Sequence, residues 1–552
     1  MIEIICVNNK QTKKYPLGTT LAEIAKKTNI QLKHPVLGAF VNNKLKELSY
    51  NIYKPKTVEF IDISHPDGMR MYVRSLSFVL QKAVSDVVPG KRIKIEHSIS
   101  KGYYCEFDGD KNSIDIDTVF AIGNRMRDII EADMPFSRNE ILSTEAIKLF
   151  EDHGLVEKAL LFKSRPQLYS SVYRLDNSID YFYGFLVPST GYLKVFDLVK
   201  YYDGMLLIVP KTENPDECEE IIIQDKLFEV FQEYQDWGEI LKVAYIGNIN
   251  QAVKNNQVSE LIKISEALHE KKVANIADMI AHRPEHPKLI LISGPSSSGK
   301  TTFANRLAVQ LKVAGLTPVT LSLDNYFVNR ELTPRDENGE YDFEAIEALD
   351  LHLLNDNLKR LFAGETVDLP KFSFHTGQRF YENDLLCIDD KTIIVAEGIH
   401  ALNPRLTSEI DEATKFKIYV SALTTVSLDN HNRIPTTDTR LVRRIIRDYK
   451  YRYYSAVETI NRWASVRKGE EKYIFPYQEN ADVMFNTAVH YETGVLKRYA
   501  EPILNEVPSN NKAYREATRL LKFFSYVVPI ADEEIPPTSI LREFLGGSSF
   551  NY

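Results

Sequence analysis

Residues 288–301 join a short apolar segment to a glycine-rich loop, and this combination most constrains the fold. The segment KLILIS leads directly into a loop that fits the pattern G-x-x-x-x-G-K-[ST]. Glycines let such a loop turn its backbone N–H groups inward around phosphate oxygens. Lys300 can then reach the terminal phosphates, and the Thr301 hydroxyl can ligate magnesium. The residues predicted to bind ATP are Gly294, Pro295, Ser296, Ser297, Ser298, Gly299, Lys300, Thr301 and Thr302.

Further apolar runs predict that this loop belongs to a parallel sheet. TPVTLSL, KTIIVAE and KFKIYVSA are continuous apolar segments separated by helical patterns, which is typical of strands buried on both faces. We therefore predict an α/β fold with a P-loop NTPase-type parallel sheet over residues 286–510.

Two carboxylates follow predicted strands of this sheet. Asp324 lies at the end of the second strand and Glu397 at the end of the third. Because sheets of this class gather ligands at the carboxyl ends of their strands, we expect both near the loop. Asp324 can take a proton from an attacking hydroxyl, and Thr301, Asp324 and Glu397 can hold Mg²⁺. The alternative is that Asp324 only caps the segment that follows it.

An arginine-rich segment follows the fourth strand. DTRLVRRIIRDYKYR carries Arg440, Arg443, Arg444 and Arg447 at spacings of three and four, so they share one helix face. Such a face is often a solvated surface. After a phosphate-binding sheet it also suits a lid that supplies positive charge to the transferred phosphoryl group. We favour the lid, with Arg440 and Arg443 as its catalytic residues.

These segments carry a family resemblance over residues 288 to about 500. In chain order they are GPSSSGKTT, SLDNYF, YDFEAIEALDL, PKFSFHTGQR, VAEGIHAL and DTRLVRRIIRD, and together they resemble the uridine kinase and phosphoribulokinase family. The resemblance implies transfer of phosphate from ATP, with Mg²⁺, to a hydroxyl of a small metabolite. It implies Asp324 as general base and places Asp342 where uridine kinases hold the ribose hydroxyls.

The sequence also departs from this family around the acceptor. The motif F-D-H-P is replaced by Tyr341-Asp342-Phe343-Glu344. The tyrosine and histidine that grip the pyrimidine fall on Phe372 and Gly377. His375 is a candidate substitute, although a lone loop histidine often has no special role. The predicted acceptor-binding residues are Tyr341, Asp342, Phe372, His375 and Arg379.

The first 65 residues predict a small α+β unit. The strand MIEIICV precedes LGTTLAEIAKKTN, where Thr19 or Thr20 can cap a helix, and strands VLGAFVNNKL and TVEFIDI follow. PLGTTLAEIA, VNNKLKEL and VEFIDI resemble the TGS domain, a ubiquitin-like module of threonyl-tRNA synthetases and some GTPases.

Residues 66–225 resemble the α+β editing domain of threonyl-tRNA synthetase. The resemblance rests on RSLSFVLQKAVSDVVPGKRIKIEHSISKGYYCEFD, RMRDIIEADMPFSRNEILSTEAIKLFE and LVPSTGYLKVFDLVKYYDG. In that family H-x-x-x-H and C-x-x-x-H supply the hydrolytic site. Here those positions are Arg74 and Phe78, then Phe182 and Leu186. Phe and Leu neither bind metal nor transfer protons, so we favour a scaffold or ligand-sensing domain over an active editing site.

The remaining segments predict a helical connector and a tail. Residues 226–285 have helical periodicity and end near Pro284 and Pro287. Residues 511–552 form a C-terminal tail, in which FFSYVVPIA suggests a strand and GGSSFNY a loose end.

Composition limits the functional classes. The 552 residues carry 68 Lys plus Arg against 76 Asp plus Glu, which argues against sequence-independent coating of nucleic acid. Four scattered cysteines form no C-x-x-C pair. No run is long and apolar enough for a signal or membrane segment, so we expect a cytoplasmic protein without a membrane partner.

The sequence therefore favours a nucleoside kinase that uses ATP and Mg²⁺. Open alternatives are a kinase for a non-nucleoside alcohol or sugar phosphate, and a nucleotide-gated regulator associated with RNA or ribosomes. N-K-x-D, which reads guanine in GTPases, is absent. RNA or a regulatory ligand at the N-terminal domains, and a homo-oligomer, are further partner hypotheses.

Overall fold

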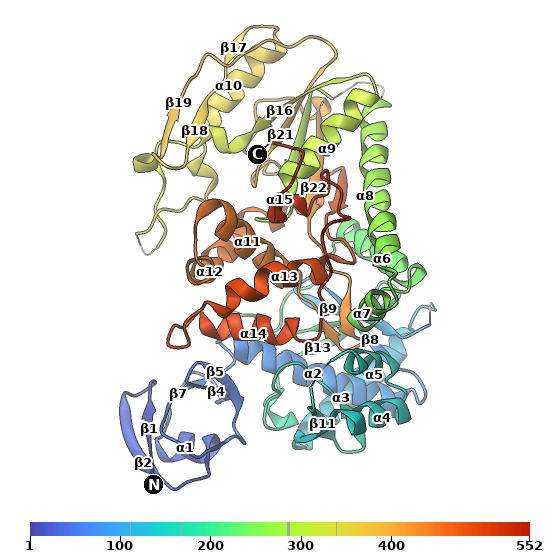
Figure 1. Ribbon diagram of the computed structural model, residues 1–552, viewed down its shortest axis with the longest axis vertical. Helices are drawn as coiled ribbons and strands as arrows, with labels where there is room; N and C mark the ends of the chain where they lie inside the picture. The colour runs from blue at the N-terminus through green and yellow to red at the C-terminus, as the bar shows by residue number, and fades with distance from the viewer. Residues whose placement is uncertain (111, 166, 284–286, 338, 552) are drawn as a thin grey trace.

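The computed structural model describes residues 1–110, 112–165, 167–283, 287–337 and 339–551. The chain is elongated, with residues 1–65 at one end and the sheet that follows residue 288 toward the other (Figure 1). Within the described residues, no helix combines the length and apolar character needed to cross a membrane.

Residues 1–65 fold around a five-stranded sheet with the order β2-β1-β7-β4-β5. The predicted helix begins after Thr20, whose hydroxyl and Glu23 form a reciprocal capping box. The helix and all three predicted strands pack their apolar side chains into one core. The elements are β1 (Ile2–Cys6), β2 (Gln11–Tyr15), β3 (Thr19–Thr20), α1 (Leu21–Lys27), β4 (Gly38–Val41), β5 (Lys44–Glu47), β6 (Asn51–Ile52) and β7 (Lys56–Ile61).

Residues 66–225 hold a four-stranded sheet, β13-β14-β9-β8, and a three-stranded sheet, β10-β11-β12. The long helix α2 packs along α3. The elements are α2 (Pro66–Val87), β8 (Ile93–Ile99), β9 (Gly102–Phe107), α3 (Ile116–Glu131), β10 (Ser137–Leu142), α4 (Ser143–Asp152), α5 (Val156–Lys163), β11 (Tyr169–Leu175), β12 (Ser178–Asp180), β13 (Asp197–Tyr201) and β14 (Gly204–Ile208).

The four positions that correspond to an editing site are occupied by a closed apolar core and a stacked arginine. The Phe78 ring lies 5.6 Å from that of Phe182 and 5.9 Å from that of Phe136. Leu186 is buried in the same cluster. The Arg74 guanidinium stacks 4.7 Å from the Tyr183 ring. This packing leaves these positions without a metal-binding or proton-transfer group, in agreement with the sequence.

The connector is helical, as its periodicity predicts: α6 (Asp225–Ile240), α7 (Ile246–Lys254) and α8 (Val258–Ala281). Helix α8 packs against the helix that follows the glycine-rich loop. The expected break at Pro284 and the domain boundary at 285–286 lie outside the described residues, and the other domain boundaries stay predictions.

The predicted parallel sheet is confirmed, with the order β16-β21-β15-β22-β25. Alternate residues of β15 face opposite sides: Leu289 and Leu291 pack toward α10, whereas Ile290 and Ile292 pack toward α8 and α9. The elements are β15 (Leu289–Ser293), α9 (Lys300–Val313), β16 (Thr317–Ser322), α10 (Leu351–Phe362), β17 (Val367–Asp368), β18 (Lys371–Ser373), β19 (Gln378–Phe380), β20 (Leu385–Leu386), β21 (Thr392–Glu397), β22 (Lys415–Ser421), β23 (Ser427–Asp429), β24 (Asn432–Arg433), α11 (Thr436–Arg452), α12 (Ala456–Tyr473), β25 (Val483–Asn486) and α13 (Glu492–Asn505).

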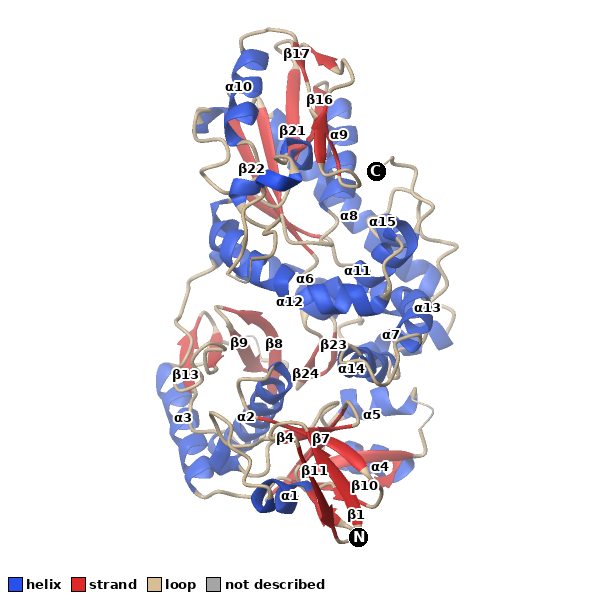
Figure 2. Cartoon of the chain, turned by 90° about the vertical axis from the view of Figure 1, so that its left-hand side faces the viewer, coloured by secondary structure: helices blue, strands red, loops and turns tan. Residues whose placement is uncertain are grey.

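One expectation for the C-terminal segment is wrong. FFSYVVPIA does not form a strand, because Leu520, Phe523 and Phe524 belong to the buried face of helix α14 (Tyr514–Phe524). The polar end GGSSFNY, described through residue 551, belongs to no helix or strand. Helix α15 (Arg542–Leu545) precedes it, and Phe544 of that helix is buried against α9. Figure 2 shows α11, α12 and α13 between the parallel sheet and the sheets of residues 66–225.

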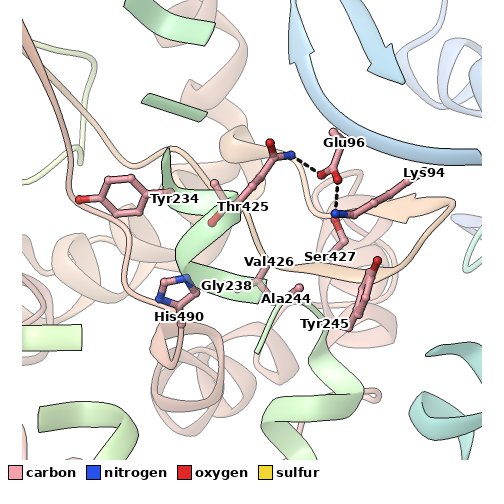
Figure 3. Close-up of a pocket in the computed structure, with 11 residues that line it drawn as sticks. Lys94, Glu96, Tyr234, Gly238, Ala244, Tyr245, Thr425, Val426, Ser427 and His490 are labelled. Atoms are coloured by element: carbon pink, nitrogen blue, oxygen red, sulfur yellow. Dashed lines mark hydrogen bonds and ion pairs between the residues drawn. The ribbon is translucent and has the colours of Figure 1, made fainter. Parts of the chain in front are cut away.

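A small pocket lies where residues 66–225, the connector and the C-terminal half meet (Figure 3). Lys94 and Glu96 of β8, Tyr234 of α6, Thr425 and His490 line it. Burial lowers the pKa of His490 to about 4, so its ring is neutral at physiological pH. No residue of the glycine-rich loop lines this cavity, which is therefore separate from the predicted site.

Candidate active site

The glycine-rich loop turns between β15 and α9, as its sequence predicts. A Cβ atom at Gly294 would lie 1.9 Å from the Val420 carbonyl oxygen, so only glycine fits between β15 and β22. Gly299 adopts a φ of +85°, in the left-handed region that favours glycine. These two positions fix the loop at the amino end of α9, where backbone N–H groups and the helix dipole favour an anion.

Neighbouring side chains hold the rim of the loop. The Ser296 carbonyl accepts a hydrogen bond from Arg440 Nε at 3.0 Å, and the Ser296 N–H donates to Glu470 Oε1 at 3.0 Å. Thr487 Oγ1 donates to the Ser298 carbonyl at 2.6 Å. The buried hydroxyls of Ser297 and Ser298 have no hydrogen-bond partner among the residues that the structure describes. A preformed loop with unsatisfied polar groups fits a phosphate ligand.

Lys300 lies beside the acidic residues predicted for the site. Its Nζ donates to the Pro295 carbonyl at 3.2 Å. Burial lowers the pKa of Lys300, whereas the nearby carboxylates of Glu397 and Asp324 oppose this effect. The ammonium group is thus fixed at the loop with negative charge close by.

The structure brings Thr301, Asp324 and Glu397 to one edge of the sheet. Ser322 of β16 pairs with Glu397 of β21, and Asp324 follows two residues later. Thr301 Oγ1 lies 3.5 Å from Glu397 Oε1. Burial, followed by the negative charge of Asp324, raises the pKa of Glu397 to about 7. A cation between them would relieve this repulsion.

Thr301, Asp324 and Glu397 suit a Mg²⁺ ion whose remaining ligands would be water and substrate phosphates. The described residues contain no cluster of three or more His, Cys, Asp or Glu side chains suited to a metal. Two carboxylates and one hydroxyl match the few protein ligands that Mg²⁺ usually takes beside substrate phosphates. Burial also raises the pKa of Asp324, although solvent reaches its side chain. A raised pKa favours a carboxylate as proton acceptor.

The two predicted lid arginines are fixed in the protein interior. Arg440 is 1% exposed and forms an ion pair with Glu470, and Arg443 is 0% exposed and pairs with Glu492. Arg443 Nη2 also donates to the Thr487 carbonyl at 3.0 Å. We therefore propose that Arg443 supports the loop through Thr487, while Arg440 holds the loop directly.

Other arginines of α11 lie nearer the exposed part of the site. Arg444 Nη1 donates to Ser296 Oγ at 2.9 Å. The charges of Arg447 and Arg452 oppose the burial that raises the pKa of Asp324. Both arginines form ion pairs with the buried carboxylate of Asp448. The sequence pattern singled out Arg444 and Arg447, but it missed Arg452, which lies beyond the predicted arginine face.

The predicted acceptor residues are only partly assembled. Asp342 Oδ2 accepts from the Tyr473 hydroxyl at 3.3 Å, and Tyr341 stacks with Arg335. The Arg379 guanidinium donates hydrogen bonds to the Asp350 carboxylate at 3.0 Å and to the Phe327 carbonyl at 3.1 Å.

Phe372 and His375 lie on the β18–β19 hairpin. Phe372 packs against the rings of Phe327 and Phe374, whereas His375 is exposed at the turn. Phe372 and Arg379 are therefore tied into local packing, whereas the side chain of His375 is exposed to solvent.

Sequence reasoning missed Glu344 as a site residue. Burial and the charge of Glu470 raise the pKa of Glu344 to about 7, with Lys300 and Asp324 also close. The sequence did contain a signal for this residue, because Glu344 replaces the proline of F-D-H-P. The sequence could not show that Glu344 lies close to Lys300 in the fold.

The C-terminal tail also reaches the loop. Glu543 Oε2 accepts from Thr302 Oγ1 at 2.7 Å and lies 3.4 Å from the Thr302 backbone nitrogen. Ile540 lies against Gly299. A carboxylate at the amino end of α9 occupies the electrostatic position that an anionic phosphate needs.

We expect Glu543→Gln to tighten binding of Mg·ATP, because it removes a competing negative charge at α9. An end charge of this kind contributes about 0.3–2 kcal/mol, which corresponds to roughly a 2- to 30-fold lower Kd. Titration with a fluorescent ATP analogue measures the change. Glu534→Gln, on an exposed part of the same tail, is the control. Unchanged or weaker binding in Glu543→Gln would rule out this competition.

The comparisons with known proteins divide the chain in two. The sequence model described as "Phosphoribulokinase / Uridine kinase family" matches residues 289–493. A threonine–tRNA ligase from Carboxydothermus hydrogenoformans is 31% identical over 192 residues, which cover 35% of this chain and 30% of that ligase. The chain thus spans less than a third of the length of this relative.

Two solved structures resemble the chain more weakly. One, described as a possible uridine kinase from Bacillus stearothermophilus, has 21% identity and a TM-score of 0.27 and covers 39% of this chain and 98% of its own. A D-glycerate 3-kinase from Cryptococcus neoformans has 14% identity and a TM-score of 0.19 and covers 51% of this chain and 89% of its own. At these scores neither likeness bears on function.

The family assignment rests on the sequence model and agrees with the parallel sheet and glycine-rich loop. Residues 289–493 therefore carry a domain of the phosphoribulokinase / uridine kinase family, and the N-terminal region is similar to threonine–tRNA ligases.

Proposed function

We propose that this protein transfers the terminal phosphoryl group of ATP to a hydroxyl of a nucleoside. The observation that carries the proposal is that Lys300 and Thr301 of the loop meet Asp324 and Glu397 at one edge of the sheet. Phosphoryl transfer needs this combination of phosphate binding, cation binding and a proton acceptor.

The residues divide the reaction among them. Lys300 and the loop amides hold the phosphates, and Thr301 and Glu397, with Asp324, would hold Mg²⁺. When bound, Mg²⁺ would neutralise charge on the phosphate oxygens. Asp324 accepts the proton of the acceptor hydroxyl as its oxygen bonds to phosphorus and the bond to the ADP oxygen breaks. Arg444 offers positive charge at the loop rim.

The acceptor is proposed from the resemblance and from Asp342. Its carboxylate lies beside the Tyr473 hydroxyl and can accept hydrogen bonds from ribose hydroxyls. Tyr341 and Phe343, whose rings are 5.8 Å apart, offer an aromatic surface next to it. These groups suit a nucleoside better than a small aliphatic alcohol.

A second candidate acceptor is a sugar phosphate. Among the described residues, Arg444, Arg447 and Arg452 pair with a single carboxylate, that of Asp448, which leaves positive charge close to Asp324. An acceptor that already carries a phosphate would use this charge.

An acceptor panel with γ-labelled ATP tests the function. We expect a nucleoside product that has gained one phosphoryl group, detected by mass. Lys300→Ala should abolish transfer, whereas Lys312→Ala, at the exposed end of the same helix, should not. Transfer to sugar phosphates alone would favour the second candidate. No transfer to any alcohol, together with tight RNA binding by the N-terminal region, would favour a regulator.

A further inference from the structure

Five cationic side chains lie close together where residues 1–65, residues 66–225 and helix α14 meet. They come from five separate elements: Lys46 of β5, Arg74 of α2, Arg138 of β10, Arg165 after α5, and Lys522 of α14. We call this group the junction cluster. The other four residues all lie close enough to Lys522 to influence its ionisation.

The junction cluster lacks the carboxylates that pair cations elsewhere in the protein. Arg519, on the same helix as Lys522, binds both Asp438 and Glu516. In the junction cluster Arg138 binds Glu140 and lies 3.6 Å from Glu47. Within the described part of the chain, Arg74, Arg165 and Lys522 make no ion pair.

Aromatic rings hold the cations in place. The Arg165 guanidinium lies 4.3 Å from the Tyr526 ring, and Arg74 lies 4.7 Å from Tyr183. Arg138 and Lys522 lie 5.5 and 5.6 Å from the same ring, that of Phe185. Cation–π contacts orient the charges but leave N–H donors free. One of these, Arg165 Nε, is buried without a hydrogen-bond partner.

Burial and the surrounding positive charges both act on the ammonium group of Lys522. Solvent reaches its side chain, yet surrounding atoms desolvate the ammonium group. Desolvation and then the charges of Arg74, Arg165, Arg138 and Lys46 lower the pKa of Lys522 to about 7. Like charges held together without a counterion destabilise the folded state, and a bound anion would remove this cost.

We propose that the junction cluster is a binding site for a small molecule that carries at least two phosphoryl groups. Arginine forks and an ammonium group match phosphate oxygens in geometry and charge. Five cations facing two carboxylates call for more than a single negative charge. Because the other four cations all lie around Lys522, and Arg138 and Lys522 share the Phe185 ring, a compact ligand fits better than an extended nucleic-acid strand.

Calorimetric titration with inorganic pyrophosphate tests the site on the full chain. A saturating non-hydrolysable ATP analogue, without added Mg²⁺, first blocks the glycine-rich loop. We expect one pyrophosphate to bind per chain, and Lys522→Gln to raise its Kd about tenfold or more, because a charge-assisted hydrogen bond is lost. Arg165→Gln should act in the same direction. Lys468→Gln, at an exposed lysine far along the chain, is the control.

Proton uptake supplies a second readout. Because an anion raises the pKa of Lys522 from about 7, binding at pH 7 should take up about half a proton. This appears as a binding enthalpy that depends on the buffer. Because pyrophosphate itself also titrates near neutral pH, the proton uptake in Lys522→Gln should be smaller than in the wild type by about half a proton rather than absent. The melting temperature of anion-free Lys522→Gln should not fall, since the variant loses only repulsion.

Three results would overturn the proposal: no pyrophosphate bound beyond the glycine-rich loop, equal affinity in Lys522→Gln, or binding of short single-stranded RNA in place of pyrophosphate. Because the readout is binding, it is independent of whether any acceptor is phosphorylated.

Discussion

Asp324→Asn is expected to lower kcat about 10²- to 10⁴-fold while leaving the affinity for ATP nearly unchanged. Asparagine keeps the size of the side chain but cannot accept the proton of the acceptor hydroxyl. Lys300 and the loop amides remain in place, so phosphate binding is retained. Initial rates with the acceptor found in the panel, together with ATP-analogue titration, separate the two effects.

Asp356→Asn provides the matched control for this experiment. Asp356 lies on α10 of the same domain and forms only a long, exposed pair with Arg360. The Asp356→Asn variant should retain full activity. Full turnover in Asp324→Asn would remove this residue from the mechanism, and a large loss of ATP affinity would reassign it mainly to cation binding.

The site residues that the sequence predicts are those that directly follow a strand in the chain. The glycine-rich loop, Asp324 and Glu397 each follow a buried strand, and parallel strands bring their carboxyl ends to one edge. Glu470 and Glu543 were not predicted, although both contact the loop or the start of α9. They arrive from segments more than 150 residues away and follow no motif, so only tertiary packing reveals them.

The errors have the same physical origin. Arg440 and Arg443 share a helix face, as the spacing indicates, but spacing cannot show that Glu470 and Glu492 bury them. The edge strand β25 has only four residues, too short for a periodic signal. In the editing-like region the sequence showed that a polar group is lost at Phe78. Only the folded structure shows that the Phe78 ring stacks on Phe136.

A buried ionic network joins residues 66–225 to the family domain. Lys158 Nζ lies 2.5 Å from Asp429 Oδ1 and 2.9 Å from Asp180 Oδ1. His431 Nδ1 lies 2.6 Å from Asp180 Oδ2, and its Nε2 contacts the Ile93 carbonyl. Beside it the Ile95 N–H donates to the Asn430 carbonyl at 2.8 Å, so the β23–β24 hairpin is bound to β8.

The pKa of Asp180 in this network predicts that stability falls at low pH. Burial alone would raise the pKa of Asp180, but Lys158 and His431 hold it below its usual value. Because the folded pKa lies below the unfolded value of about 4, the contribution is present above pH 4 and is lost as pH falls through the lower folded value.

Lys158→Met should therefore destabilise the folded chain by about 3–5 kcal/mol at pH 7, because two fully buried carboxylates lose their cation. Chemical denaturation followed by fluorescence measures the loss. Lys163→Met, at an exposed position of the same helix, should change stability by less than about 1 kcal/mol. Lowering the pH toward 4 should narrow the difference in unfolding free energy between Lys158→Met and wild type, because in the variant the buried carboxyls without the ammonium group take up protons at a higher pH than in the wild type. Equal stability of the two variants would mean that the network does not hold the halves together.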